Sequence, residues 1–177
     1  MVPASGLRAF RETDWSAVCE IDDLAKPDEL AGVVPPDRIL PLAADAEMQR
    51  LFRESSLMVA ECGVQIVGFA GNRGTLITWL FVRPSHRRSG VATGLLAELL
   101  ARLERPVTLN VAAGNAAARL LYERFGFQLM REFAGNFQGT PCTVVTLQLL
   151  SQGLTSARES LRRSALGDPK PAVKVKR

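Results

Sequence analysis

The sequence predicts an α+β protein, and three observations carry this prediction. Residues 76–82 are almost wholly apolar and rich in β-branched and aromatic side chains, which is typical of a buried strand. Apolar side chains recur at helical spacing over residues 91–103 and predict an amphipathic helix. Two further apolar runs, residues 57–61 and 64–71, flank Cys62-Gly63 and predict a β-hairpin. The chain therefore combines strands and helices.

The same patterns predict the N-terminal elements. Residues 7–11 alternate apolar and charged side chains, as a half-buried strand does. Thr13 or Asp14 can cap a helix, which the pattern predicts over residues 15–24. Residues 25–41 hold four prolines and a glycine with little periodicity, so we expect an irregular segment there. Asp45 can begin a second helix, which we expect to end near residue 53.

The C-terminal elements begin after a proline break. Residues 107–111 predict a strand, and residues 116–125 predict a helix. Gly126 can end that helix as a left-handed cap. Residues 127–133 and 143–149 then predict two more strands, joined by a loop that contains glycine and proline.

Length and composition exclude several classes of protein. A chain of 177 residues suits one domain with a tail. The longest apolar run is about seven residues, short of the ~20 that span a bilayer, and the first twenty residues lack a signal-peptide core. The three cysteines are widely spaced, without a CxxC pair. We therefore expect no metal site, no disulfide framework and a cytoplasmic location.

The net charge of +4 is unevenly distributed. Residues 151–177 carry seven Lys/Arg and two Asp/Glu, a net +5, so residues 1–150 carry −1. We expect a domain over residues 1–150 and a basic tail over 151–177, with a short helix at most before a solvated end. The alternative use of the tail is contact with an acidic partner or RNA. Nucleic-acid binding by the domain is not indicated.

A basic, glycine-containing loop joins the buried strand to the leucine-rich helix. Free N–H groups and the positive end of the helix dipole favour phosphate at such a place. Gly90 lets the backbone approach an anion closely, and Arg87 and Arg88 add positive charge. Neither the GxGxxG nor the GxxxxGK[ST] pattern is present. The loop therefore predicts a phosphorylated cofactor of another kind.

Two blocks of sequence resemble one known family. Residues 87–92, Arg-Arg-Ser-Gly-Val-Ala, match the [RQ]xxGx[GA] signature of the GNAT acetyltransferase superfamily. Residues 109–127, LNVAAGNAAARLLYERFGF, look like the family's later strand-helix segment, and residues 58–71 are similar to its second and third strands. The resemblance covers residues 7–150. It implies a central mixed, mostly antiparallel sheet flanked by helices.

The resemblance implies N-acetyl transfer from acetyl-CoA to a primary amine by direct attack. Tyr122 stands at the position of the general acid, and Asn115 at that of a pantetheine contact. A slot for pantetheine is expected where the strand at residues 76–82 splays from that at residues 107–111. The cofactor-binding residues that the resemblance assigns are Leu80, Phe81, Val82, Arg87, Arg88, Ser89, Gly90, Val91, Ala92 and Asn115.

The general base is not evident from the sequence. Thr78 and Asn110 stand where relatives often carry glutamate, and neither can accept a proton near neutrality. A water chain, an acceptor that arrives deprotonated, or a carboxylate such as Glu61 or Asp22 could take the role. His86 is the only histidine of the sequence, and histidine is a residue type that often serves as a base. It occupies, however, a position at which the family tolerates a packing aromatic.

The sequence does not identify the acceptor amine. Residues 21–37 lie where the family builds part of the acceptor site, and their five acidic side chains could attract a cationic amine or simply be solvated. Residues 134–141 are expected on the opposite side. The acyl chain and the oligomeric state, a homodimer included, are also open. Two rival functions remain: an acyl-CoA-binding regulatory module of the same fold without efficient turnover, and an interaction protein that works through its basic tail.

Overall fold

A computed structural model describes residues 6–150 of the chain. The expected basic tail and its short helix lie outside the described residues, as does the N-terminal segment before Gly6.

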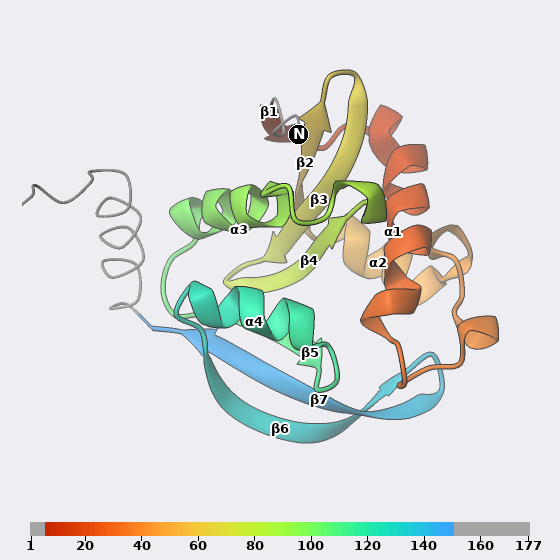
Figure 1. The fold of residues 1–177 in the computed structure, drawn as a ribbon, viewed down its shortest axis with the longest axis vertical. Coiled ribbons are helices and arrows are strands. Elements are labelled where there is room, and N and C mark those ends of the chain that lie inside the picture. Colours follow the sequence, from red (N-terminus) through yellow and green to blue (C-terminus); the bar gives the residue numbers. More distant parts are fainter. Residues whose placement is uncertain (1–5, 151–177) are drawn as a thin grey trace, which may run out of the picture.

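The described residues form a seven-stranded sheet in the order β1-β2-β3-β4-β5-β7-β6 (Figure 1). Neighbouring strands are antiparallel except for β4 and β5, which are parallel. This confirms the predicted α+β class and the mixed, mostly antiparallel sheet. The strands are β1 Gly6–Ala9, β2 Ser56–Cys62, β3 Gln65–Arg73, β4 Leu76–Val82, β5 Val107–Ala112, β6 Gln128–Phe137 and β7 Thr140–Leu149.

Within residues 6–150, four α-helices cover both faces of the sheet. Helices α3 and α4 lie on one face, in front in Figure 1, and α1 and α2 pack against the other. The bounds are α1 Trp15–Glu29, α2 Ala46–Arg53, α3 Val91–Arg102 and α4 Ala116–Arg124. Over residues 6–150, none of them combines the length and apolarity that a membrane-spanning helix needs. Two cores result, one on each side of the sheet.

A β-bulge at Thr78 changes which face the β4 side chains meet. Asn72 of β3 pairs with Ile77, and Gly71 pairs with Trp79, so Thr78 is the extra residue. Ile77 therefore packs with α3 and α4, whereas Trp79, two residues later, packs with α1 and α2. In a regular strand these two side chains would share a face.

The strands β4 and β5 separate just after the bulge begins. They pair only at Leu76 with Thr108 and at Ile77 with Leu109. Beyond Ile77, the edge of β4 that faces β5 has no strand partner within the described residues. This confirms the predicted splaying of the two strands, which leaves a slot in the sheet.

Three elements differ from the sequence prediction. Helix α1 continues to Glu29, past the predicted end at residue 24, because Ala25, Lys26 and Leu30 are buried against the rest of the domain. Pro27 falls in the last turn, where α1 ends two residues later. The predicted loop over residues 134–141 is mostly strand, because the β6–β7 ladder extends to the Phe137–Thr140 pair around a turn at Gln138-Gly139. Val64 lies in the β2–β3 turn and is fully exposed.

Gly68 allows α3 to lie close to the sheet, and this gives a stability prediction. A Cβ at Gly68 would come within 2.9 Å of the Phe81 carbonyl oxygen and 3.0 Å of a Val91 methyl carbon. We expect Gly68→Ala to lower the free energy of unfolding by about 1–3 kcal/mol, measured by urea denaturation, because backbone must move. Gly94→Ala is the matched control, since a Cβ there meets nothing within 4 Å. Equal effects of the two substitutions would contradict this packing argument.

Candidate active site

A cavity of about 430 Å³ opens where β4 and β5 separate, between α1, α3 and α4. It brings together residues that lie far apart in the sequence. All the residues predicted for the site line it except Ser89: Leu80, Phe81, Val82, Arg87, Arg88, Gly90, Val91, Ala92, Asn115 and Tyr122. The two sequence blocks that carried the family resemblance therefore meet at one place.

The loop before α3 has a backbone shaped by two positive φ angles, 57° at Arg88 and 89° at Gly90. A Cβ on Gly90 would meet nothing within 4 Å, so glycine is favoured there by its φ angle rather than by lack of space. Ser89 lies outside the cavity lining and holds the loop instead, because its hydroxyl donates to the His86 carbonyl at 2.5 Å. The N-terminus of α3 therefore lies at the cavity. Its free N–H groups and helix dipole favour the binding of a phosphate group at such a place.

Two ion pairs connect α1 to the segment that follows β4. Arg83 donates to both carboxylate oxygens of Glu20, at 2.6 and 2.9 Å, and Arg83 itself is buried. Arg87 donates to Asp28 at 2.5 Å, near the C-terminal end of α1. The last turn of α1 is therefore held beside the loop that precedes α3.

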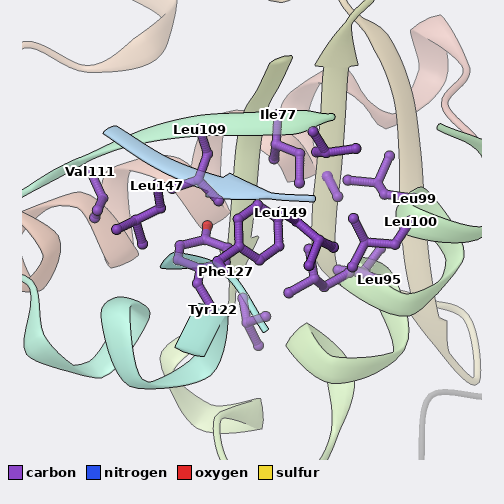
Figure 2. Packing of buried hydrophobic residues seen from close by; sticks show 14 of the residues in the cluster. Ile77, Leu95, Leu99, Leu100, Leu109, Val111, Tyr122, Phe127, Leu147 and Leu149 are labelled. Atoms are coloured by element: carbon purple, nitrogen blue, oxygen red, sulfur yellow. The ribbon is translucent and has the colours of Figure 1, made fainter. Parts of the chain in front are cut away.

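Tyr122 is buried at the inner end of the cavity. Its ring packs edge-on against Phe127, with the centroids 5.6 Å apart, and Figure 2 shows it pointing from α4 toward the sheet among apolar side chains. Burial raises the pKa of the hydroxyl, and the nearby charge of Glu29 raises it further. Tyr122 is therefore protonated at neutral pH, the state in which its O–H can be donated.

Three polar residues of the lining have partners within the protein. The Asn115 side chain is the N-cap of α4 and accepts the Ala118 N–H at 3.1 Å. The Thr78 hydroxyl lies 2.9 Å from that of Ser55. The Asn110 amide oxygen accepts from the Thr146 hydroxyl at 2.8 Å. The two positions where relatives often have glutamate thus hold neutral, hydrogen-bonded side chains.

The carboxylates suggested by the sequence as bases lie elsewhere. Glu61 is on β2, where it accepts from Arg8 at 2.7 Å. Asp22 is fully buried and forms an ion pair with Lys26. Neither residue lines the cavity. His86 does line it, from the loop before α3, with Nδ1 3.0 Å from the Ser85 hydroxyl.

Glu29 lines the cavity; it is one of the five acidic side chains that the sequence analysis placed near the acceptor site, but it was not considered there as a base. It is the last residue of α1 and is partly exposed to the cavity. Burial, together with the charge of Asp22, raises its pKa to about 7, against the opposing effect of Lys26. The available signal was its spacing from Asp22 and Lys26, which places three ionisable side chains on one helical face. The prediction that α1 ends at residue 24 concealed that pattern.

The segment between α1 and α2 closes the same end of the domain. Val33 packs against Gly114 of the β5–α4 loop, 3.9 Å from the position of a Cβ on that glycine. The Gln138 amide accepts from the Leu40 N–H at 2.9 Å and donates to Asp45 at 2.6 Å. The tip of the β6–β7 hairpin thus contacts residues 40–45. It does not line the cavity, so the expectation that residues 134–141 form its opposite side is not met.

Residues 53–129 match a family model described as an acetyltransferase (GNAT) domain. The chain carries a GNAT domain. The matched range includes the bulged strand, the loop before α3 and Tyr122, so it covers most of the elements that form the cavity. The family and fold predicted from the two sequence blocks are confirmed.

Curated proteins with similar sequences include acetyltransferases. The uncharacterized N-acetyltransferase YafP of Escherichia coli K12 is 27% identical over 71% of this chain and 83% of its own length. The mycothiol acetyltransferase of a Parafrankia strain is 32% identical over 80% of this chain and 46% of its own length. Human cysteine-rich protein 2-binding protein is 45% identical over 29% of this chain, which spans 7% of that protein. The chain thus spans less than half of two of these relatives.

Solved structures with the same fold include a GCN5-related N-acetyltransferase from Rhodopseudomonas palustris. It has a TM-score of 0.69 and 20% identity, covering 85% of this chain and 98% of that one. The yncA structure from Salmonella typhimurium contains its cofactor acetyl-CoA, with a TM-score of 0.62, 19% identity, and coverage of 82% and 92%. At this identity the likeness establishes the fold alone.

Proposed function

We propose that the GNAT domain transfers the acetyl group of acetyl-CoA to a primary amine by direct attack. One observation carries the proposal: a single cavity joins an unpaired strand edge, a helix N-terminus preceded by a basic loop, and a buried, protonated tyrosine. Each of these three features suits a different part of acetyl-CoA. The likeness to yncA, which was solved with acetyl-CoA, supports the choice of donor.

The slot suits the pantetheine arm of the donor. The backbone of Leu80, Phe81 and Val82 pairs with β3 on one side and with no strand on the other within the described residues. An extended amide chain can hydrogen-bond to such an edge as an added strand would. The diphosphate would then lie against the N-terminus of α3, with Arg87 and Arg88 beside it.

Acetyl transfer in the slot needs a proton donor for the leaving thiolate. The amine nitrogen bonds to the carbonyl carbon, backbone N–H groups near Phe81 and Val82 stabilise the oxyanion, and the carbon–sulfur bond then breaks. The Tyr122 hydroxyl would give its proton to the departing sulfur. Asn115, as the cap of α4, would hold the first turn of the helix that presents Tyr122.

The second candidate is an acyl-CoA-binding module without efficient turnover. Thr78 and Asn110, which stand where relatives often carry glutamate, favour it. The buried Tyr122 hydroxyl argues against it, because binding alone does not require an acid at that position.

The experiment is thiol release from acetyl-CoA in the presence of a panel of amines. The panel contains polyamines, aminoglycosides, amino acids and peptides with free N-termini. It also includes mycothiol-type amines, because one relative is named for mycothiol. We expect thiol release that depends on one class of amine. Saturable binding of acetyl-CoA with no release for any amine would favour the binding module, and no binding would contradict the proposal.

A further inference from the structure

The inner face of α1 carries an unusual row of charges. Asp22, Lys26 and Glu29 are four and three residues apart, so they share one helical face. Asp22 and Lys26 are 0% and 3% exposed, at positions where apolar residues would ordinarily pack. Buried charges of this kind are costly, and they often mark a functional site. The row ends at the cavity, at Glu29.

The first two charges neutralise each other and leave the third available. Asp22 and Lys26 form an ion pair, and neither has a further hydrogen-bond partner within residues 6–150. Asp28 and Glu29 are the carboxylates among the residues that line the cavity, and Asp28 is paired with Arg87. Of these two carboxylates, Glu29 is therefore the one that forms no ion pair with Lys or Arg among the described residues.

The charged groups around Glu29 lie on its own helix and on the other elements that face the cavity. On its own helix, Asp22 raises and Lys26 lowers its pKa, and the C-terminal end of the helix dipole also disfavours negative charge. The titratable and charged groups that face the same cavity from other elements are Tyr122, Arg124, His86, Arg87 and Arg88. Among them, the hydroxyl of Tyr122 lies near enough for the charge of Glu29 to act on its pKa.

We propose that Glu29 is the general base, which removes a proton from the ammonium group of the acceptor before attack. This rests on the proposed acetyl transfer. The ammonium gives one proton to the Glu29 carboxylate, and the free amine attacks the acetyl carbonyl carbon. The thiolate leaves as the carbon–sulfur bond breaks and takes the Tyr122 proton, and the second proton of the nitrogen replaces it. The net products are the amide, CoA thiol and one proton, which Glu29 releases to solvent.

This assignment accounts for the missing glutamates. Thr78 and Asn110 cannot accept the proton, and Glu29 places a carboxylate in the same cavity from a different element. A base that titrates near the working pH is half ionised there and still takes up a proton readily. The acceptor class that fits is an amine that arrives as a cation, since an amine already in its free-base form would need no such residue.

The decisive comparison is Glu29→Gln against the wild type, with Glu104→Gln as the charge-matched control at an exposed position outside the cavity. Two readouts are needed. The first is the ¹³C titration of glutamate carboxyl groups by NMR, which requires no acceptor. We expect one glutamate carboxyl to titrate near pH 7, and that signal to be missing from Glu29→Gln alone.

The second readout is kcat/KM against pH with the panel amine that gives the highest turnover. At pH 7 we expect Glu29→Gln to lose about 10²–10⁴-fold in kcat/KM. The loss should shrink about tenfold per pH unit toward the pKa of the amine, because the free amine then forms without a base. Affinity for acetyl-CoA should be unchanged. Thermal stability at pH 8 should not fall, since the variant removes a poorly solvated charge.

The outcomes separate the two proposals. If no glutamate carboxyl titrates near pH 7 in the wild type, Glu29 is not the base, whatever the acceptor. The same conclusion follows if the titration near pH 7 is still observed in Glu29→Gln. A loss that stays constant with pH would assign Glu29 a structural role and overturn the inference, while acetyl transfer itself stands. Absence of turnover with every amine would count against the proposed transfer, and the NMR titration would still decide the ionisation of Glu29.

Discussion

Replacing Tyr122 by Phe should lower kcat by about 10²–10⁴-fold, the usual contribution of a positioned acid or base. The substitution removes only the hydroxyl oxygen. The ring keeps its edge-on contact with Phe127 and its place in the apolar cluster of Figure 2. Affinity for acetyl-CoA should therefore be nearly unchanged, because the slot between β4 and β5 and the loop before α3, which we propose hold the cofactor, are formed by other residues. Steady-state kinetics and calorimetric titration with acetyl-CoA measure the two effects separately.

The thermal stability of Tyr122→Phe is the control for this prediction. The Tyr122 hydroxyl lies in surroundings that raise its pKa through burial, so its removal should not destabilise the domain by much. A thermal unfolding midpoint close to that of the wild type would show that any loss of kcat is chemical. Full activity of Tyr122→Phe would mean that the leaving thiolate is protonated by another group.

Replacing Lys26 by Met should be the most destabilising change on α1, at about 3–5 kcal/mol, because it leaves a buried carboxylate unpaired. Asp22 is 0% exposed and pairs with Lys26 alone among the described residues. The double variant Asp22→Leu/Lys26→Met removes both charges, so most of the lost stability should return. The single and double variants together separate the cost of an unpaired charge from the loss of packing.

The effect of Lys26→Met should depend on pH in a defined direction. Burial raises the pKa of Asp22, and Lys26 opposes that rise, so removal of Lys26 raises the pKa further. An acid with a raised pKa in the folded state destabilises that state above its pKa and ceases to do so once protonated. The destabilisation should therefore shrink as the pH falls from 8 to 5 in urea denaturation. A loss independent of pH, or a double variant as unstable as the single, would contradict the ion-pair account.

Local sequence signals predicted most elements of the fold. Asp45 begins α2 by accepting the Met48 N–H at 3.0 Å, and Gly126, at φ 88°, follows the end of α4, as expected. These features depend on side chains within a few residues of the helix ends. The family resemblance added the order of the elements and the splaying of β4 from β5, which short-range patterns do not specify.

The parts that were missed depend on contacts between distant segments. Prolines at residues 25–41 suggested an early end to α1, but burial of Lys26 and Leu30 against the domain extends the helix to Glu29. Glu29 could not be identified as a candidate base because Tyr122, whose pKa its charge affects, is 93 positions away in the sequence. The bulge at Thr78 was equally hidden, since it is defined by pairing with β3.

The most direct test of the account is to follow a ¹³C-labelled acetyl group from acetyl-CoA during turnover with the best amine of the panel. The account predicts that the label appears in an amide of the acceptor, one equivalent for each thiol released. It also predicts that both rates fall together in Tyr122→Phe and in Glu29→Gln. Thiol release that leaves the label in acetate, or acetyl-CoA that binds and stays intact with every amine, would contradict the assignment of this domain as an N-acetyltransferase.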